Sequence, residues 1–184
     1  ALPVLHENTE LTLSSRSIFS NGKLKTVPEK LFANNKKVTT FNSLFANSES
    51  FESVPAGLFA NNPEVDSFRM LFSGTSLKSV PDGLFANNHK VTNFQSAFSK
   101  TAIQSVPADL FAGCGKVTTF MSCFTGCSEL QSVPAELFKS SGAFTTVTKT
   151  AFNNIFKDCT SLTEVPAGLF DGFTLITAFN DAFN

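Results

Sequence analysis

The chain has no tryptophan and no tyrosine among its 184 residues, although it has 22 phenylalanines, and it has only two histidines and four cysteines. Aromatic rings without a hydroxyl or an indole N–H suit stacks in equivalent apolar positions better than a polar binding site. No apolar run approaches the roughly 18 to 20 residues that a membrane span requires, so no membrane-spanning helix is expected. The stretch Ala1 to Leu5 has neither the basic start nor the apolar segment of a signal peptide, so an export signal has been removed or was never present.

Charge of one sign is also scarce. The 14 basic and 15 acidic residues give a net charge of -1, and like charges form no run. Binding to a phosphate backbone or to an anionic membrane surface needs a basic patch, so nucleic acid is not an expected partner. The sequence contains no phosphate-binding glycine loop and no HExxH motif. His6 and His89 have no serine, cysteine or paired carboxylate at a meaningful spacing. Neither a catalytic residue nor a cofactor is therefore predicted.

What the chain does contain is the motif Val-Pro-x-x-Leu-Phe, repeated along its whole length. The interval between successive copies is nearly constant, and only the last one is clearly longer. Such a fixed period indicates a repeat protein in which each unit buries its apolar face against its neighbours, and hence one elongated domain. The copies are Val27 to Phe32, Val54 to Phe59, Val80 to Phe85, Val106 to Phe111, Val133 to Phe138 and Val165 to Phe170.

A second motif, Val-x-x-Phe followed by another Phe four residues later, lies between the copies of the first. A spacing of four places both rings on one face of a short helical turn. In the unit around residue 80, Leu77 to Val80 alternates apolar and polar residues, as a half-buried strand does, and Pro81 suits the start of a helical or 3₁₀ segment. Each unit is therefore predicted to form one coil.

Stacking these coils would align three phenylalanine ladders that hold 19 of the 22 rings and dominate stability. The ladders are Phe32, Phe59, Phe85, Phe111, Phe138, Phe170; Phe41, Phe68, Phe94, Phe120, Phe152, Phe179; and Phe19, Phe45, Phe72, Phe98, Phe124, Phe156, Phe183.

Three regions depart from the repeat. Residues 1–17 do not fit the unit and are interpreted as an N-terminal capping segment. In the fifth unit the interval from Val133 to Phe152 exceeds the interval from Val106 to Phe120 by five positions, an insertion that we place within Lys139 to Ala151. Insertions in solenoids go to surface loops and often lie on the binding face, although a merely tolerated loop is the alternative. The solenoid of residues 18–184 ends without a cap, which predicts either a longer natural chain or self-association through the C-terminal coil.

The cysteines are interpreted as structural residues. Cys123 occupies a position held elsewhere by Leu, Ala or Ile, so it belongs to the core. Cys127 and Cys159 share a position in adjacent coils, which in principle permits a disulfide. Serine and threonine fill that position in other units, which favours free thiols in a buried hydrogen-bonding slot. Cys114 replaces an asparagine, and no histidine lies at zinc-ligand spacing from any cysteine, so no metal site is predicted.

Three asparagine pairs follow the Leu-Phe of their units. They could bind a polar ligand, but their place at the end of a turn favours hydrogen bonds to backbone groups and left-handed geometry. The pairs are Asn34-Asn35, Asn61-Asn62 and Asn87-Asn88.

Parts of the chain resemble a known family. Phe124 to Pro134 and Phe156 to Pro166 match the pattern Phe-x-x-Cys-x-x-Leu-x-x-Val, which is similar to the signature of the BspA-like leucine-rich repeats. The resemblance covers roughly residues 18 to 184, but the period is longer and the earlier units replace the cysteine. It implies an α/β, right-handed leucine-rich-repeat-like solenoid of six coils with a period of about 26–27 residues, with short parallel strands and short helical or 3₁₀ turns. It also implies a secreted or bacterial cell-surface location, a role in adhesion or host contact, and no enzymatic activity.

The candidate binding surface is the outward position of each predicted strand, where polar residues vary on a constant core. A merely solvated face is the alternative interpretation. The leading hypothesis is a non-catalytic extracellular module that binds a protein, for example a host matrix or cell-surface protein. The rival hypothesis is a structural spacer. A third hypothesis, a surface binder that uses an array of Thr39, Thr92 and Thr118, is weaker because Asp66 interrupts the array. The candidate residues are Lys25, Glu52, Lys78, Gln104, Gln131 and Thr163.

Overall fold

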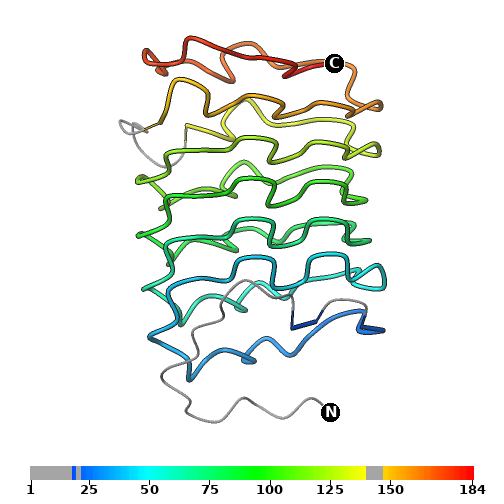
Figure 1. The fold of residues 1–184 in the computed structure, drawn as a ribbon, viewed down its shortest axis with the longest axis vertical. Coiled ribbons are helices and arrows are strands. Elements are labelled where there is room, and N and C mark those ends of the chain that lie inside the picture. Colours follow the sequence, from blue (N-terminus) through cyan, green and yellow to red (C-terminus); the bar gives the residue numbers. More distant parts are fainter. Residues whose placement is uncertain (1–17, 20–21, 140–146) are drawn as a thin grey trace.

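The computed structural model describes residues 18–19, 22–139 and 147–184. Successive coils lie on one another in a single column, from the blue N-terminal coil to the red C-terminal coil (Figure 1). The predicted capping segment, residues 1–17, lies outside the described residues.

The phenylalanine ladders are confirmed as the core of the column. Phe59, Phe85, Phe94 and Phe98 are fully buried. Ring centroids of successive coils lie 6.0 Å apart in the Phe59–Phe85 pair, and neighbouring ladders meet within a coil, since Phe85 and Phe94 lie 5.0 Å apart. Burial of each ring contributes roughly 1.5 to 3 kcal/mol, so the ladders are the main source of stability.

The helical turn predicted around the paired phenylalanines is wrong for the described residues, which contain no helix. The amides of Phe41, Ser43 and Phe45 donate to carbonyl groups of the next coil at N···O distances of 3.1, 2.8 and 3.0 Å. The amide of Leu44, between them, donates three residues back to Phe41 at 3.2 Å. Ser43 has a left-handed φ of 56°, which interrupts any helix. Alternate amides therefore bond between coils, and the others close turns.

The strand predicted at Leu77 to Val80 is also absent as a regular element. The described residues contain no strand of two or more paired residues, only isolated parallel bridges that join Thr40 to Ser67, Ser67 to Asn93 and Asn93 to Thr119. These bridges lie at the residue before the first Phe of the second motif. On the Leu77 side of the coil, Lys78 N–H donates to the Glu52 carbonyl at 3.2 Å. Backbone hydrogen bonds on this side are too few to form a regular parallel β-strand pair.

The segment after each Val-Pro forms turns and not the predicted helical or 3₁₀ piece. Leu31 N–H donates to the Pro28 carbonyl at 3.1 Å, and Ala33 N–H donates to the Lys30 carbonyl at 3.1 Å. These bonds span three residues each and do not continue into a helix. Proline begins the turn as expected, because the first residue of the turn donates no hydrogen bond within it and the absence of a proline N–H therefore costs nothing.

The insertion in the fifth coil is divided into two parts. Val147 is buried, 4% exposed, and Thr148 N–H donates to the Thr118 carbonyl at 2.9 Å. Val147 thus occupies the position that Val117 has in the preceding coil. The interval from Val133 to Val147 exceeds the interval from Val106 to Val117 by three positions, so three of the extra residues precede Val147 and the other two lie between it and Phe152. Residues 140–146, within the predicted insertion, lie outside the described residues.

No helix in the described part of the chain is long and apolar enough to cross a membrane.

Candidate functional site

The six candidate residues hold equivalent positions in successive coils, here called the row, and backbone hydrogen bonds between coils join five of them. The amides of Glu52 and Lys78 donate to the carbonyls of Lys25 and Glu52, at 2.9 and 3.2 Å, and Gln131 N–H donates to the Gln104 carbonyl at 2.9 Å. Thr163 is the equivalent residue of the last such segment. Glu52 is half-buried and the other five are exposed.

Charges alternate in the first half of this row. Lys25 Nζ lies 3.3 Å from Glu52 Oε1, and Lys78 Nζ lies 3.3 Å from Glu52 Oε2. Hydrogen bonds from Lys25 and Lys78 lower the pKa of the Glu52 carboxyl below its ordinary value. The carboxylate thus stays charged at neutral pH, and the three side chains together carry one net positive charge.

The second half of the row is uncharged at its own positions. Gln104 Nε2 donates to Glu129 Oε2 at 3.3 Å, which brings a carboxylate to the row that sequence reasoning missed. Glu129 immediately precedes Leu130, the buried leucine of its unit. Because neighbouring residues of an extended segment point to opposite sides, the position of Glu129 next to Leu130 could have identified Glu129 as outward-facing.

The threonine array has fewer free hydroxyls than the sequence implies. Thr92 Oγ1 donates to the Asp66 carbonyl at 3.2 Å, and Thr118 Oγ1 donates to the Thr92 carbonyl at 3.0 Å. These donors join neighbouring coils. Thr92 and Thr118 are also half-buried, whereas Thr39 is exposed, so the array presents no uniform surface.

All four cysteines lie in the described residues and are buried free thiols. Cys127 Sγ lies 3.0 Å from the Phe98 carbonyl oxygen and Cys159 Sγ lies 3.1 Å from that of Phe124, so both act as hydrogen-bond donors to the preceding coil. Burial raises the pKa of the Cys114 and Cys159 thiols to about 12. A thiol that stays protonated at neutral pH is a poor nucleophile and metal ligand. The described residues hold no group of three or more His, Cys, Asp or Glu side chains that could bind a metal ion.

The second asparagine of two pairs, Asn62 and Asn88, binds backbone, as predicted, but it does so between coils. Asn62 Nδ2 donates to the carbonyls of Phe32 and Asn35 at 3.1 and 2.9 Å, and Asn88 Nδ2 repeats the pattern one coil later. Left-handed φ is not observed at these asparagines. Because the side chains of Asn62 and Asn88 are fully buried, these residues are structural.

Comparison with known proteins establishes the class of fold. No protein-family model matches the chain, and no curated protein matches it. Among solved structures, the chain is similar to Toll in the Toll–Spatzle complex of Drosophila, in its glycosylated form, with a TM-score of 0.57 and 22% identity over 86% of this chain. It is also similar to the APL1 leucine-rich repeat domain, with a TM-score of 0.50 and 15% identity over 76% of this chain. The column of coils is a leucine-rich-repeat solenoid.

The likeness is one of architecture. The chain spans 19% of the length of the Toll chain and 35% of the length of the APL1 chain. Fold alone does not define function, so the role of the molecule has to be argued from its surfaces.

Proposed function

We propose that this solenoid is a non-catalytic extracellular module for protein recognition or adhesion, and that the row from Lys25 to Thr163 is its binding surface. The observation that supports this most directly is the register of the row: variable polar side chains project at regular intervals from a core of buried rings. A rigid array of this kind is how solenoids form extended surfaces for partners.

Two further points support the proposal. The similar Toll structure was solved in complex with a protein, Spatzle. The Phe-x-x-Cys-x-x-Leu pattern of the later units resembles the BspA-like repeats, which implies a secreted or bacterial cell-surface protein and a host matrix or cell-surface partner.

Charge reversal within the row tests the proposal. Immobilised wild-type protein is exposed to matrix and cell-surface extracts and compared with the variant Lys78→Glu, which places like charges beside Glu52. The matched control is Lys90→Glu, because Lys90 also forms an inter-coil ion pair, with Nζ 2.6 Å from Glu64 Oε2, outside the row. We expect saturable capture of a protein that the Lys78 variant loses and the Lys90 variant keeps. Equal capture by both variants would refute the row as the binding surface.

The alternative function is a spacer that displays another domain at a cell surface. The ion pairs within the row favour it, because Lys25, Glu52 and Lys78 already satisfy one another and surface pairs of this kind are compatible with a merely solvated face. Repeated absence of any saturable partner, with the protein folded, would support the spacer.

A further inference from the structure

The row is interrupted at one junction in the middle of the column, between the third coil (residues 77–102) and the fourth coil (residues 103–129). Backbone hydrogen bonds join the row residues of the first three coils to one another, and they join the row residues of the fourth and fifth coils. In the described part of the chain, no hydrogen bond or ion pair joins Lys78 and its neighbours in the row segment to Gln104 and its neighbours. The row is thus bonded on either side of this junction but not across it.

The first phenylalanine ladder is interrupted at the same junction. Phe85 and Phe111 form no ring contact with each other, although both are fully buried and Phe111 packs on Phe94 with centroids 4.8 Å apart. A row bond is also absent at Thr163 in the last coil, but there the ladder continues. Among the described coils, the two interruptions therefore coincide only between the third and the fourth. At the other junctions the rings of this ladder stack, with centroids 6.5, 6.0, 5.8 and 5.9 Å apart in the pairs Phe32–Phe59, Phe59–Phe85, Phe111–Phe138 and Phe138–Phe170.

The buried asparagines that bind between coils also stop here. Asn88 Nδ2 donates to two carbonyls of the second coil, at 3.2 and 2.9 Å. Cys114 takes the equivalent position in the fourth coil, and its Sγ lies 3.7 and 3.8 Å from two carbonyl oxygens of the third coil. A thiol has one weak donor, whereas a side-chain amide has two strong ones. At the surface of this edge, His89 Nδ1 lies 3.0 Å from the Gly113 carbonyl oxygen, so an exposed side chain supplies the short polar contact that a buried asparagine makes in the coils before.

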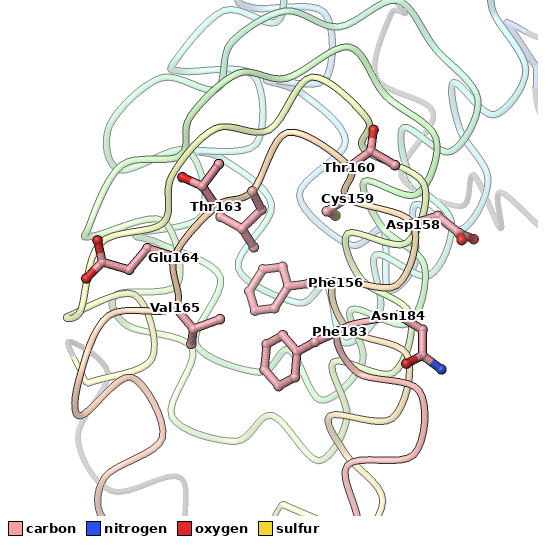
Figure 2. Close-up of a pocket in the computed structure, with 10 residues that line it drawn as sticks. Phe156, Asp158, Cys159, Thr160, Thr163, Glu164, Val165, Phe183 and Asn184 are labelled. Carbon is pink, nitrogen blue, oxygen red and sulfur yellow. The ribbon is translucent and has the colours of Figure 1, made fainter.

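The second-motif side of the same junction is bonded as it is in the preceding coils. Alternate amides of the third coil, from Phe94 to Lys100, donate to carbonyls of the fourth coil at distances between 2.8 and 3.1 Å. The third phenylalanine ladder also continues, since the Phe98 and Phe124 centroids lie 5.5 Å apart. The same ladder is seen further along the column in Figure 2, where Phe156 and Phe183 lie side by side with centroids 5.9 Å apart. The third and fourth coils are therefore held firmly on one side and weakly on the other.

From this asymmetry we infer that the column contains a hinge between the third and fourth coils. The bonded turns of the second motif form its axis, and the two coils separate on the side of the Val-Pro segments. In a repeat protein each junction has its own stability, and segments with few bonds between them open at the lowest cost. The residue that weakens this junction is Cys114, which stands where the preceding coils have asparagine.

The hinge divides the row where its chemistry changes. Lys25, Glu52 and Lys78 form the charged half, and Gln104 and Gln131 belong to the half that is uncharged at its own positions. Bending at the hinge tilts one half relative to the other. A partner that touches both halves selects the angle at which both are within reach, and its affinity falls as that angle becomes less populated. The hinge itself is a property of the free protein and does not depend on the proposed function.

Amide hydrogen exchange of the wild-type chain, followed by NMR, is the first test. Thr92 N–H donates to the Asp66 carbonyl and Thr118 N–H donates to the Thr92 carbonyl, both at 2.8 Å, so the two bonds report on the junctions before and after the third coil. Valine precedes both threonines, which makes their intrinsic exchange rates alike. In a uniform column that opens from its ends, the more central Thr118 exchanges more slowly. The hinge reverses this order, and Thr118 N–H should exchange about tenfold faster than Thr92 N–H. Equal rates, or slower exchange at Thr118, would overturn the inference.

Spin labels on the exposed side of the Val-Pro segments provide the second test. One labelled pair, Ser79→Cys with Ser132→Cys, spans the hinge, and the matched control, Thr26→Cys with Ser79→Cys, is also two coils apart but lies before it. The three side chains are exposed, and all four native thiols are buried, so the label is directed to the introduced cysteines.

The distribution of label distances should be about twice as wide for the pair that spans the hinge as for the control pair. Adding Cys114→Asn should narrow it towards the control, because the asparagine amide can donate to the third coil as Asn88 donates to the second. Equal widths in the two pairs, or a width that Cys114→Asn does not change, would overturn the inference. Both tests are made without a partner, whereas capture by Lys78→Glu tests the row as a binding surface, so the two proposals fail independently.

Discussion

The central coils and the C-terminal coil are built from the same residue types in the same register, yet they differ in burial. Phe94 and Phe98 are fully buried, whereas their counterparts in the last coil, Phe179 and Phe183, are 40 and 49% exposed. The difference shows that stability in this fold arises at the junction between coils and not within a coil, as nearest-neighbour descriptions of solenoids assume. The last described coil packs against one neighbouring coil, and a central coil packs against two.

The comparison also holds for hydrogen bonds. In a central coil, Phe94 N–H donates to the next coil and Thr92 N–H donates to the preceding one. The coil therefore has a direction, with some segments bonding forwards and others backwards. The terminal coil can make only the backward set, which leaves Asp181 and Phe183 N–H groups facing outwards.

The largest expected effect separates a central from a terminal ring. Phe94→Ala should lower the free energy of unfolding by about 3 to 5 kcal/mol, as expected for a ring lost from a packed core. Phe183→Ala should cost about 1 to 2 kcal/mol, since half of that ring is already exposed. Denaturant midpoints of both variants provide the measurement. Equal shifts would break the distinction between central and terminal coils.

Alkaline pH should reveal the buried thiols of both regions. Burial raises the pKa of Cys114, in a central coil, and of Cys159, in the C-terminal part of the column, to about 12, whereas an unfolded thiol has a pKa of about 8.5. Since the unfolded chain releases these protons first, stability is fully present below pH about 8.5 and is lost as pH rises towards 12. The loss approaches about 1.4 kcal/mol per pH unit for each thiol.

The control for the alkaline effect is the double variant Cys114→Asn with Cys159→Ser, which places uncharged hydrogen-bonding residues at both positions. Denaturant titrations from pH 8 to 10.5 should show a flatter decline for this variant, and an unchanged slope would mean that other groups cause the loss. Lysine titration affects both proteins alike, so it cancels in the comparison.

Shortening the fifth coil tests whether it is a central coil with a loop added. Removal of three residues between Lys139 and Val147 makes the interval from Val133 to Val147 equal to that from Val106 to Val117 and keeps the two extra residues before Phe152. Stability should therefore change little, by about 0.6 kcal/mol or less, as loop-closure entropy predicts. We also expect weaker capture of the protein partner, because insertions in solenoids often lie on the binding face. As a contrast, removal of residues 149–151 takes out the fully buried Ala151, whose carbonyl accepts the Phe120 N–H at 2.9 Å, and should be strongly destabilising.

The smallest expected effects concern the surface and the redox state. Gln104→Ala, in the middle of the exposed row, should change stability by no more than about 0.5 kcal/mol. A reducing agent should leave the melting curve almost unchanged, because Cys127 and Cys159 each donate to a backbone carbonyl and are not joined to each other. A mass difference of a disulfide in the native protein would contradict this.

The amino-acid sequence by itself determined the register of the molecule. The distance from Val-Pro to the following Phe is the same in every unit except the fifth, which allows only one alignment of the coils. From that alignment follow the buried ladders, the in-register row and the structural position of the cysteines.

The tertiary structure decided the backbone path within each coil. A spacing of four between Phe41 and Phe45 fits a helix, but it fits equally a turn with a left-handed residue at Ser43, and only the carbonyls of the next coil make the second path favourable. Hydrogen bonding between coils also determined that Val147 lies in the core. Val147 takes the position that Val117 has in the preceding coil because Thr148 N–H donates to the Thr118 carbonyl there. Local sequence cannot specify where a hydrogen bond goes when its acceptor lies a full repeat away along the chain.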